Sequence, residues 1–370
     1  MGRPEDDAGR GLAPDARIGP ALGRQHALDG LRGLAALAVA IAHCNLAVTG
    51  TDVWAARLRD FHDLPVASLA GRLFYVVSPG DAAVTLFFVL SGYVLWSAFA
   101  RHGTTTLADL PDYTLRRAYR LMPVAIVSAI PIGFVVNASA FDLARTMLLL
   151  TNDLNGVLWT LQVEVVGSFP IFLVRIMVGE SRAGLVGSVL VALALSYPLR
   201  AFSSALFLPA FLLGALVSAS PARWWTSRAL LGASVSGLAL ASLLFSHSVR
   251  ARYVEMAAAA AVIACTLVRP LAALKAPQVQ FLGAVSYPFY LTHGTTLLAA
   301  QHLGLVTGIG NAAGRIVAYV LLTVPVALAA AWLLHVLIEA PAMRFRPRLG
   351  TARIQGKPGA ARSAAGQARP

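Results

Sequence analysis

Apolar segments long enough to cross a lipid bilayer recur along almost the whole chain of 370 residues. A helix of about 20 apolar residues spans the hydrocarbon core, and 57% of the residues are hydrophobic while 13% are charged. A soluble domain is less apolar than this. The pattern predicts an all-α fold, a polytopic transmembrane helix bundle of about ten spans. The spans are expected at residues 30–49, 82–100, 119–137, 157–178, 183–199, 203–220, 229–246, 254–271, 281–303 and 314–338.

The basic residues are distributed unevenly between the expected loops. The net charge is +13, and with both termini cytoplasmic the ten spans place 22 of the 30 Lys and Arg residues inside and the other 8 outside. Because cytoplasmic loops carry an excess of Lys and Arg, we interpret this charge as topology and expect no nucleic acid partner. The sequence predicts a multi-pass protein of the inner or plasma membrane, with a lipid bilayer as its partner.

The ends of the chain differ from its middle in composition. Residues 1–27 and 346–370 are polar and contain much Gly, Ala, Pro and Arg. Such segments bury too little apolar surface to fold. We therefore expect two disordered cytoplasmic tails around one transmembrane domain at residues 28–345.

Arg32 and His43 lie eleven positions apart at the first expected span. Eleven steps of about 100° return a helix to nearly the same face, with about 16 Å of rise. A guanidinium at the membrane surface and a deeper imidazole therefore share one stripe. Ionisable side chains inside a membrane indicate a functional site, although a lone His can also be a hydrogen-bonded core residue. Asp29 shares the stripe, and a helix N-cap is its favoured role.

Two more ionisable groups are expected at about the depth of His43. Glu164 and His293 fall into the same layer when residues are counted from the expected span ends at about 1.5 Å each. Three such groups in different helices indicate a shared polar cavity. Structural and catalytic roles are equally open for Glu164. His293 shares a helix face with Ser286 and Tyr290, and this group fits either acceptor binding or hydrogen bonds between helices.

A cluster of arginines precedes the third expected span. Arg117 and Arg120 are three residues apart, so two guanidiniums on one helix face can bind one phosphate group. The spacing alone favours a positively charged membrane anchor over phosphate binding. Cys44 points about 100° away from His43 and is interpreted as a packing residue rather than a thioester nucleophile. No zinc spacing, and hence no metal site, is indicated.

Six short segments follow one another along the chain: LDGLRGLAA at 28–36 followed by His43, FFVLSGY at 87–93, RRAYRLMP at 116–123, LWTLQVE at 158–164, SYPFYLTH at 286–293 and IEAP at 338–341. In this order they resemble the membrane acyltransferase-3 family. The resemblance extends from about residue 26 to 345, and any one segment alone is weak.

The resemblance implies O-acyl transfer from cytoplasmic acyl-CoA, typically acetyl-CoA, to a carbohydrate or glycosylated acceptor. Acyl-CoA would be a substrate, and no permanently bound cofactor is expected. Family membership implies essential roles for Arg32 and His43, and CoA binding by Arg117 and Arg120. The chain departs from its relatives at 161–166, which has one acid where relatives often have two. It also lacks the appended extracellular hydrolase-like domain of some relatives, which favours direct transfer.

The combined hypothesis assigns His43 as general base and Glu164 as the carboxylate that orients the imidazole or the sugar. The arginines would hold the CoA phosphates, while Ser286, Tyr290 and His293 would contact the acceptor. Three alternatives stay open: a route through acylated His43, a secondary transporter, and a non-catalytic membrane subunit of polysaccharide assembly. The sequence does not identify the acceptor.

Overall fold

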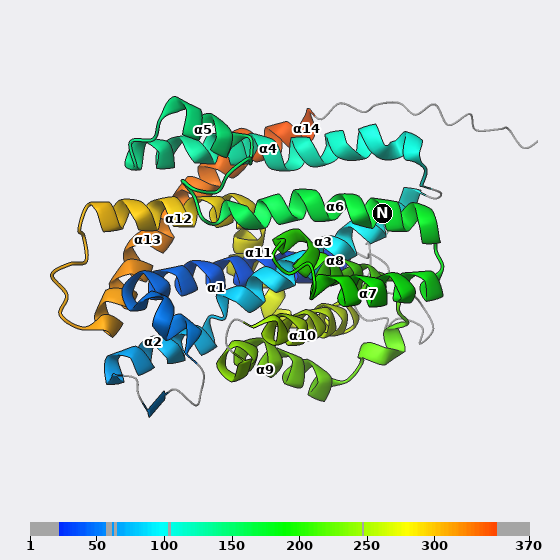
Figure 1. Cartoon of the computed structure of the whole chain (residues 1–370), viewed down its shortest axis with the longest axis horizontal. Helices are drawn as coiled ribbons and strands as arrows, with labels where there is room; N and C mark the ends of the chain where they lie inside the picture. Colours follow the sequence, from blue (N-terminus) through cyan, green and yellow to red (C-terminus); the bar gives the residue numbers. More distant parts are fainter. Residues whose placement is uncertain (1–21, 57–60, 63–64, 103–104, 246–247, 346–370) are drawn as a thin grey trace, which may run out of the picture.

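A computed structural model describes residues 22–345, apart from 57–60, 63–64, 103–104 and 246–247, and its regular elements are all helices (Figure 1). Most of both predicted tails therefore lies outside the described residues. The described helices are α1 (Leu22–Ala55), α2 (Val66–Val77), α3 (Gly80–His102), α4 (Leu110–Val135), α5 (Ala140–Met147), α6 (Leu158–Val178), α7 (Arg182–Ser196), α8 (Ser203–Ala219), α9 (Arg228–Phe245), α10 (Val249–Val268), α11 (Pro277–Ala284), α12 (Ser286–His302), α13 (Ala312–Leu334) and α14 (Ala340–Arg344).

Each predicted span overlaps one of the longer helices, which confirms the all-helical class. Within the described residues, six stretches are long and apolar enough to cross a membrane, so the chain is a multi-pass membrane protein. Helices α7, α8 and α9 have 15, 17 and 18 residues, and about 20 are needed for a full span. The count of ten spans stays a prediction. The six stretches are His26–Thr51, Ser68–Arg101, Leu107–Val135, Leu158–Val178, Val249–Val268 and Ala312–Arg344.

Helix α3 occupies the centre of the bundle, where it packs against α1, α6, α8 and α10. Its apolar side chains belong to the main buried core together with those of α6, α8 and α10. In Figure 1 the longer helices run mostly side by side, and α1 extends leftward from the described N-terminus to α2. A helix that is apolar on nearly all sides is typical of the interior of a membrane bundle.

Two glycines bring α3 and α8 into close contact. A Cβ atom on Gly92 would lie 1.9 Å from the carbonyl oxygen of Phe211, and one on Gly214 would lie 1.9 Å from that of Val89. Small residues allow such backbone approach between membrane helices. Gly92, which follows Ser91 in the FFVLSGY segment, therefore allows α3 to approach α8 closely.

The start of α1 differs from the sequence-based prediction. The helix begins at Leu22, inside the predicted tail at 1–27, and Asp29 lies two turns further on. The prediction that Asp29 caps this helix is therefore wrong. Apolar residues 27 and 28 are buried against the bundle, and this tertiary packing extends the helix beyond the apolar run that marked its expected start. The backbone breaks from helical geometry at Gly50, where φ is 75°.

Candidate functional site

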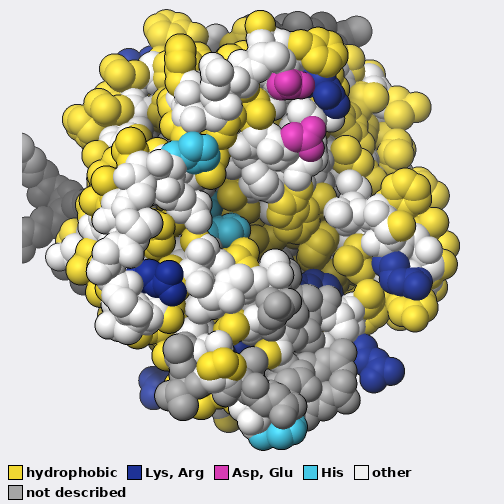
Figure 2. All heavy atoms as spheres, turned by 60° about the vertical axis from the view of Figure 1, so that its left-hand side comes forward, with side chains coloured by type: hydrophobic (Ala, Val, Ile, Leu, Met, Phe, Trp, Pro, Cys, Tyr) yellow, Lys and Arg dark blue, Asp and Glu magenta, His cyan; other side chains and the backbone are white. Residues whose placement is uncertain are grey.

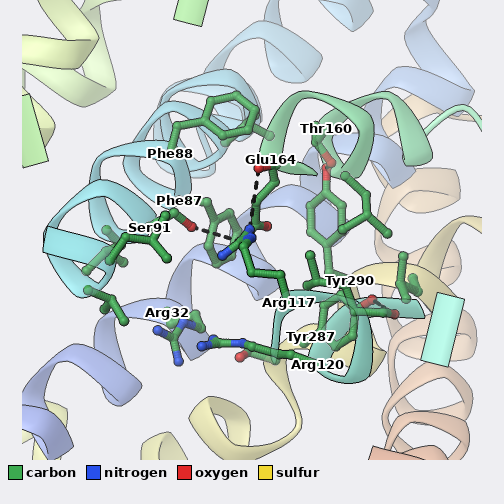
Figure 3. A pocket seen from close by; sticks show the side chains of 18 residues that line it. Arg32, Phe87, Phe88, Ser91, Arg117, Arg120, Thr160, Glu164, Tyr287 and Tyr290 are labelled. Carbon is green, nitrogen blue, oxygen red and sulfur yellow. Dashed lines mark hydrogen bonds and ion pairs between the residues drawn. The ribbon is translucent and has the colours of Figure 1, made fainter. Parts of the chain in front are cut away.

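A cavity lies between α1, α3, α4, α6 and α12, and six of the eight predicted site residues line it (Figure 3). His43 and His293 are not part of its lining. The cavity wall combines three guanidiniums with one carboxylate, several aromatic rings and apolar side chains. The predicted residues in the lining are Arg32, Arg117, Arg120, Glu164, Ser286 and Tyr290.

The carboxylate of Glu164 is held by two neighbouring helices. Arg117 Nη2 on α4 donates to Glu164 Oε1 over 3.2 Å, and Ser91 Oγ on α3 donates to the same oxygen over 3.1 Å. The side chain of Arg117 is only 12% exposed, and that of Glu164 is 24% exposed. A charge-assisted pair with this little solvent fixes both groups in direction. Glu164 was predicted to orient the imidazole or the sugar, and no hydrogen bond between it and the His43 imidazole occurs among the described residues.

The other two guanidiniums of the cavity are less fully paired. Arg32 Nη1 lies 3.3 Å from Asp29 Oδ1, one turn earlier on α1, and the Asp29 side chain is 43% exposed. Arg120 has no hydrogen-bond or ion-pair partner within the described part of the chain, although it interacts electrostatically with Arg32, Arg117 and Glu164. In Figure 3 the side chains of Arg32 and Arg120 approach each other at one end of the cavity. This end has an excess of positive charge that suits an anion.

The opposite end of the cavity is closed by Tyr290. Its hydroxyl accepts a hydrogen bond of 3.0 Å from Thr160 on α6. Its ring meets Phe87 edge-on with centroids 5.7 Å apart. Ser286 donates to the Gly283 carbonyl over 2.8 Å, so its oxygen keeps acceptor capacity toward the cavity.

The two histidines form a pair just beyond Tyr290. His43 Nδ1 on α1 and His293 Nε2 on α12 are 3.0 Å apart, and their ring centroids are 5.1 Å apart. His293 is 3% exposed, whereas His43 is partly exposed. The Tyr290 ring lies against His293 with centroids 5.5 Å apart. Tyr290 thus contacts both the cavity and the imidazole pair.

Glu164 lies nearer the arginine end of the cavity than the histidines do. Thr160 on α6 is hydrogen-bonded to Tyr290 on α12. Glu164 lies one turn after Thr160 on α6, and His293 lies about one turn after Tyr290 on α12. The two helices run in opposite directions, so these two turns lead away from each other. The separation amounts to seven helical positions, or about 10 Å. The predicted single layer therefore holds for His43 and His293 and is wrong for Glu164. Counting residues from expected span ends misses the relative shift of packed helices.

Cys44 faces away from this site. Its thiol is 2% exposed and lies 3.5 Å from the Thr323 hydroxyl on α13. It packs in a small apolar cluster with Leu297 and Tyr319. This environment agrees with a packing role. No three His, Cys, Asp or Glu side chains among the residues described are close enough together to hold a metal ion.

Several lining residues escaped the sequence-based assignment. Ser91, Thr160 and Tyr287 contribute polar atoms to the cavity or its wall, and Tyr287 also donates to the Leu121 carbonyl over 2.5 Å. Helical spacing offered a signal, because Ser91 is four residues from Phe87 and Thr160 is four residues from Glu164. Neutral hydroxyls are common in membrane helices, so this spacing alone does not distinguish a site.

The comparisons with known proteins agree with this chemistry. A sequence model described as an acyltransferase domain matches residues 25–335. The matched range contains every residue named in the cavity and the histidine pair. No curated protein and no solved structure matches the chain significantly.

Proposed function

Because the chain belongs to the acyltransferase-3 family, it is a membrane acyltransferase, and we propose that its donor is acyl-CoA and its acceptor a carbohydrate hydroxyl. The acyl group is expected to be acetyl. The carrying observation is a cavity that is lined by three guanidiniums, two of them at one end, with a hydrogen-bonded histidine pair beyond Tyr290 at the other end. A long donor with anionic phosphates and a distant thioester matches that polarity.

The donor would enter from the arginine end. Arg120 and Arg32 would bind CoA phosphates, because Arg120 has no partner within the described residues and a guanidinium binds phosphate oxygens in pairs. Arg117 is held by Glu164 and would add charge in a fixed direction. Along α1, the rise from Arg32 to His43 is about 16 Å, which is comparable to the reach of the pantetheine arm. The thioester would then arrive next to Tyr290 and the histidine pair.

His43 would act as the general base. In this proposal its Nδ1 donates a proton to the hydrogen bond with His293 Nε2, which leaves the His43 Nε2 lone pair for the substrate. That nitrogen removes the proton of the acceptor hydroxyl while the oxygen attacks the thioester carbonyl carbon. The carbon–sulfur bond breaks, CoA leaves as a thiolate, and the imidazolium returns the proton to it. The products are an O-acyl ester and free CoA.

Glu164 has a different role in this proposal from the one predicted from sequence. Its carboxylate binds Arg117 and Ser91 and lies about 10 Å from the histidine pair by helical rise. We assign it as a positioning residue for the donor site. His293, predicted to contact the acceptor, becomes the positioning residue for His43, and Tyr290 becomes the boundary between donor and reacting group.

The decisive experiment measures free CoA thiol released from acetyl-CoA by the protein in nanodiscs, with a panel of glycan acceptors. His43→Ala is expected to lower turnover by about 10² to 10⁴-fold, while acetyl-CoA binding stays within twofold of wild type. The matched control is His302→Ala, because His302 is an exposed histidine on α12 that lies outside the cavity. Unchanged turnover in His43→Ala would refute the general-base assignment.

The same preparation separates the rival functions. Movement of substrate across sealed vesicles without acyl-CoA would favour a transporter. Binding of acyl-CoA without turnover in wild type for any acceptor would favour a non-catalytic subunit. Acylated protein trapped in the absence of acceptor would favour a covalent route through His43.

A further inference from the structure

A second cavity lies where four helices begin. It is bounded by the first residues of α3, α6, α8 and α10, namely Asp81, Trp159, Ser203, Val249 and Arg252, together with Val84, Leu206 and Phe207. In the predicted topology these four helices all start on the outer side of the membrane. Figure 2 looks toward the left-hand end of Figure 1, where α1 ends, and shows a hollow with apolar walls and a histidine side chain.

The two cavities follow one another along α3. Val84 belongs to the walls of both. Phe88 lines the first cavity and packs against Trp159 and Phe207 of the second. From Asp81 to Ser91, α3 thus runs from the outer cavity to the arginine cavity. A donor in one and an acceptor in the other would meet near Val84.

The outer cavity also lies beside the reacting histidine. Gly80 packs against α1, where an added Cβ atom would lie 2.7 Å from the Cβ of Ala42. Asp81 follows Gly80 on α3, and His43 follows Ala42 on α1. Asp81 and His43 interact electrostatically. A hydroxyl group bound at Asp81 would therefore be at the level of His43.

The aromatic part of the wall is a group of packed rings. The rings of Trp159 and Phe207 have centroids 5.7 Å apart, and Phe88 packs on both at 6.2 and 4.8 Å. Trp159 is partly exposed, and its indole N–H donates to no described residue. An indole held in this way offers a flat apolar face together with one unused donor. One face of a pyranose ring, with its C–H groups, has the matching shape and polarity.

The polar part of the wall carries paired charges. Arg252 Nη2 donates to Asp81 Oδ2 over 2.6 Å, and its Nη1 donates to the buried Glu255 over 2.8 Å. Asp81 keeps 23% exposure, and a carboxylate has about four acceptor sites. Because Asp81 and Arg252 neutralise each other, the lining favours a neutral ligand with many hydroxyl groups over an ion.

We propose that this outer cavity is the acceptor subsite and binds a neutral pyranose, with Trp159 stacking on the sugar ring and Asp81 and Arg252 hydrogen-bonding its hydroxyls. The proposal rests on the acyl transfer proposed above. It assigns transfer across the bilayer to two cavities that share Val84 and lie beside the histidine pair. The acceptor then never needs to enter the arginine cavity.

A labelling experiment tests the subsite without catalysis. Ser203→Cys places an accessible thiol at the cavity wall, while the native cysteines Cys44 and Cys265 are buried. A membrane-impermeant maleimide added from outside should label it, and saturating methyl glucoside, galactoside or mannoside should slow the labelling at least fivefold. Gly308→Cys is the matched control, because an added Cβ there meets nothing within 4 Å and its labelling should not change. Failure of all three glycosides to protect Ser203→Cys would overturn the proposal.

A kinetic experiment separates this proposal from the donor assignment. Trp159→Ala should lower kcat/KM for a protecting glycoside at least tenfold and leave the Kd for acetyl-CoA within twofold. Trp159→Phe, which preserves more packing, should cause a smaller loss in the same direction. Trp332→Ala on α13 is the control, since Trp332 is 49% exposed and lines neither cavity. Wild-type kinetics in both Trp159 variants would refute the acceptor subsite. If the wild-type protein does not bind acetyl-CoA, the donor function is refuted instead.

Discussion

His43 Nδ1 lies 3.0 Å from His293 Nε2, although the two residues are 250 positions apart in the chain. The contact joins α1 to α12 at the boundary of the cavity. It occupies one nitrogen of the His43 ring and so leaves the other for chemistry. A general base whose second ring nitrogen is hydrogen-bonded is pre-oriented for proton transfer.

His293→Leu is expected to lower kcat about 100-fold, because a ring misplaced by about 1 Å costs a factor of this size. The KM for acetyl-CoA should stay near wild type, since the arginine end of the cavity is untouched. His293→Gln retains a polar group near the position of Nε2 and should recover part of kcat. Equal kcat values for the Leu and Gln variants would contradict a positioning role.

The contact between α3 and α8 makes a separate prediction about stability. Gly92→Ala would place a methyl group 1.9 Å from the Phe211 carbonyl oxygen and should destabilise the protein by at least about 2 kcal/mol. Gly232→Ala in α9 is the control, because an added Cβ there meets nothing within 4 Å. The control should be neutral or stabilising by up to about 1 kcal/mol. The measurement is the unfolding midpoint in detergent, and equal midpoints for both variants would contradict the packing.

Much of the fold could be predicted because long apolar runs identify membrane helices without tertiary information. The breaks between helices were harder. The predicted span at 281–303 crosses the junction of α11 and α12 at Val285, because Gly283 and Pro288 on either side of it interrupt no apolar run. Helix α2 lies in the predicted outer loop between the first two spans. It was not predicted because its 12 residues are too few to be recognised as a span.

The site was predictable along single helices and less so between them. The spacing of Arg32 and His43 follows from helical geometry alone. The partners of Glu164 and His293 depend on how five helices pack, and sequence spacing does not contain that information. Sequence also does not distinguish the roles of neighbouring residues within a motif segment. In FFVLSGY, Ser91 lines the cavity, whereas Gly92 contributes to helix packing.

Arg120→Ala is expected to weaken acetyl-CoA binding about 10 to 100-fold, since a hydrogen bond to a charged group contributes about 1.5–3 kcal/mol. Stability should change little, because Arg120 has no partner within the described residues. Arg269→Ala removes an exposed arginine at the end of α10 and should leave the Kd unchanged. The Kd is measured by calorimetry in nanodiscs, and equal affinity in both variants would remove Arg120 from the donor site.

The pair of Arg117 and Glu164 allows structural and binding roles to be separated within one experiment. Arg117→Met leaves the Glu164 carboxylate buried without its cation, which should cost on the order of 3 kcal/mol of stability. Adding Glu164→Gln removes that charge, so the double variant should regain most of the lost stability. It should not regain affinity, because the guanidinium that contributes to phosphate binding is still missing. We therefore expect the unfolding midpoint to recover in the double variant while the Kd for acetyl-CoA stays at least tenfold above wild type. Recovery of both quantities together would show that Arg117 serves only to neutralise Glu164.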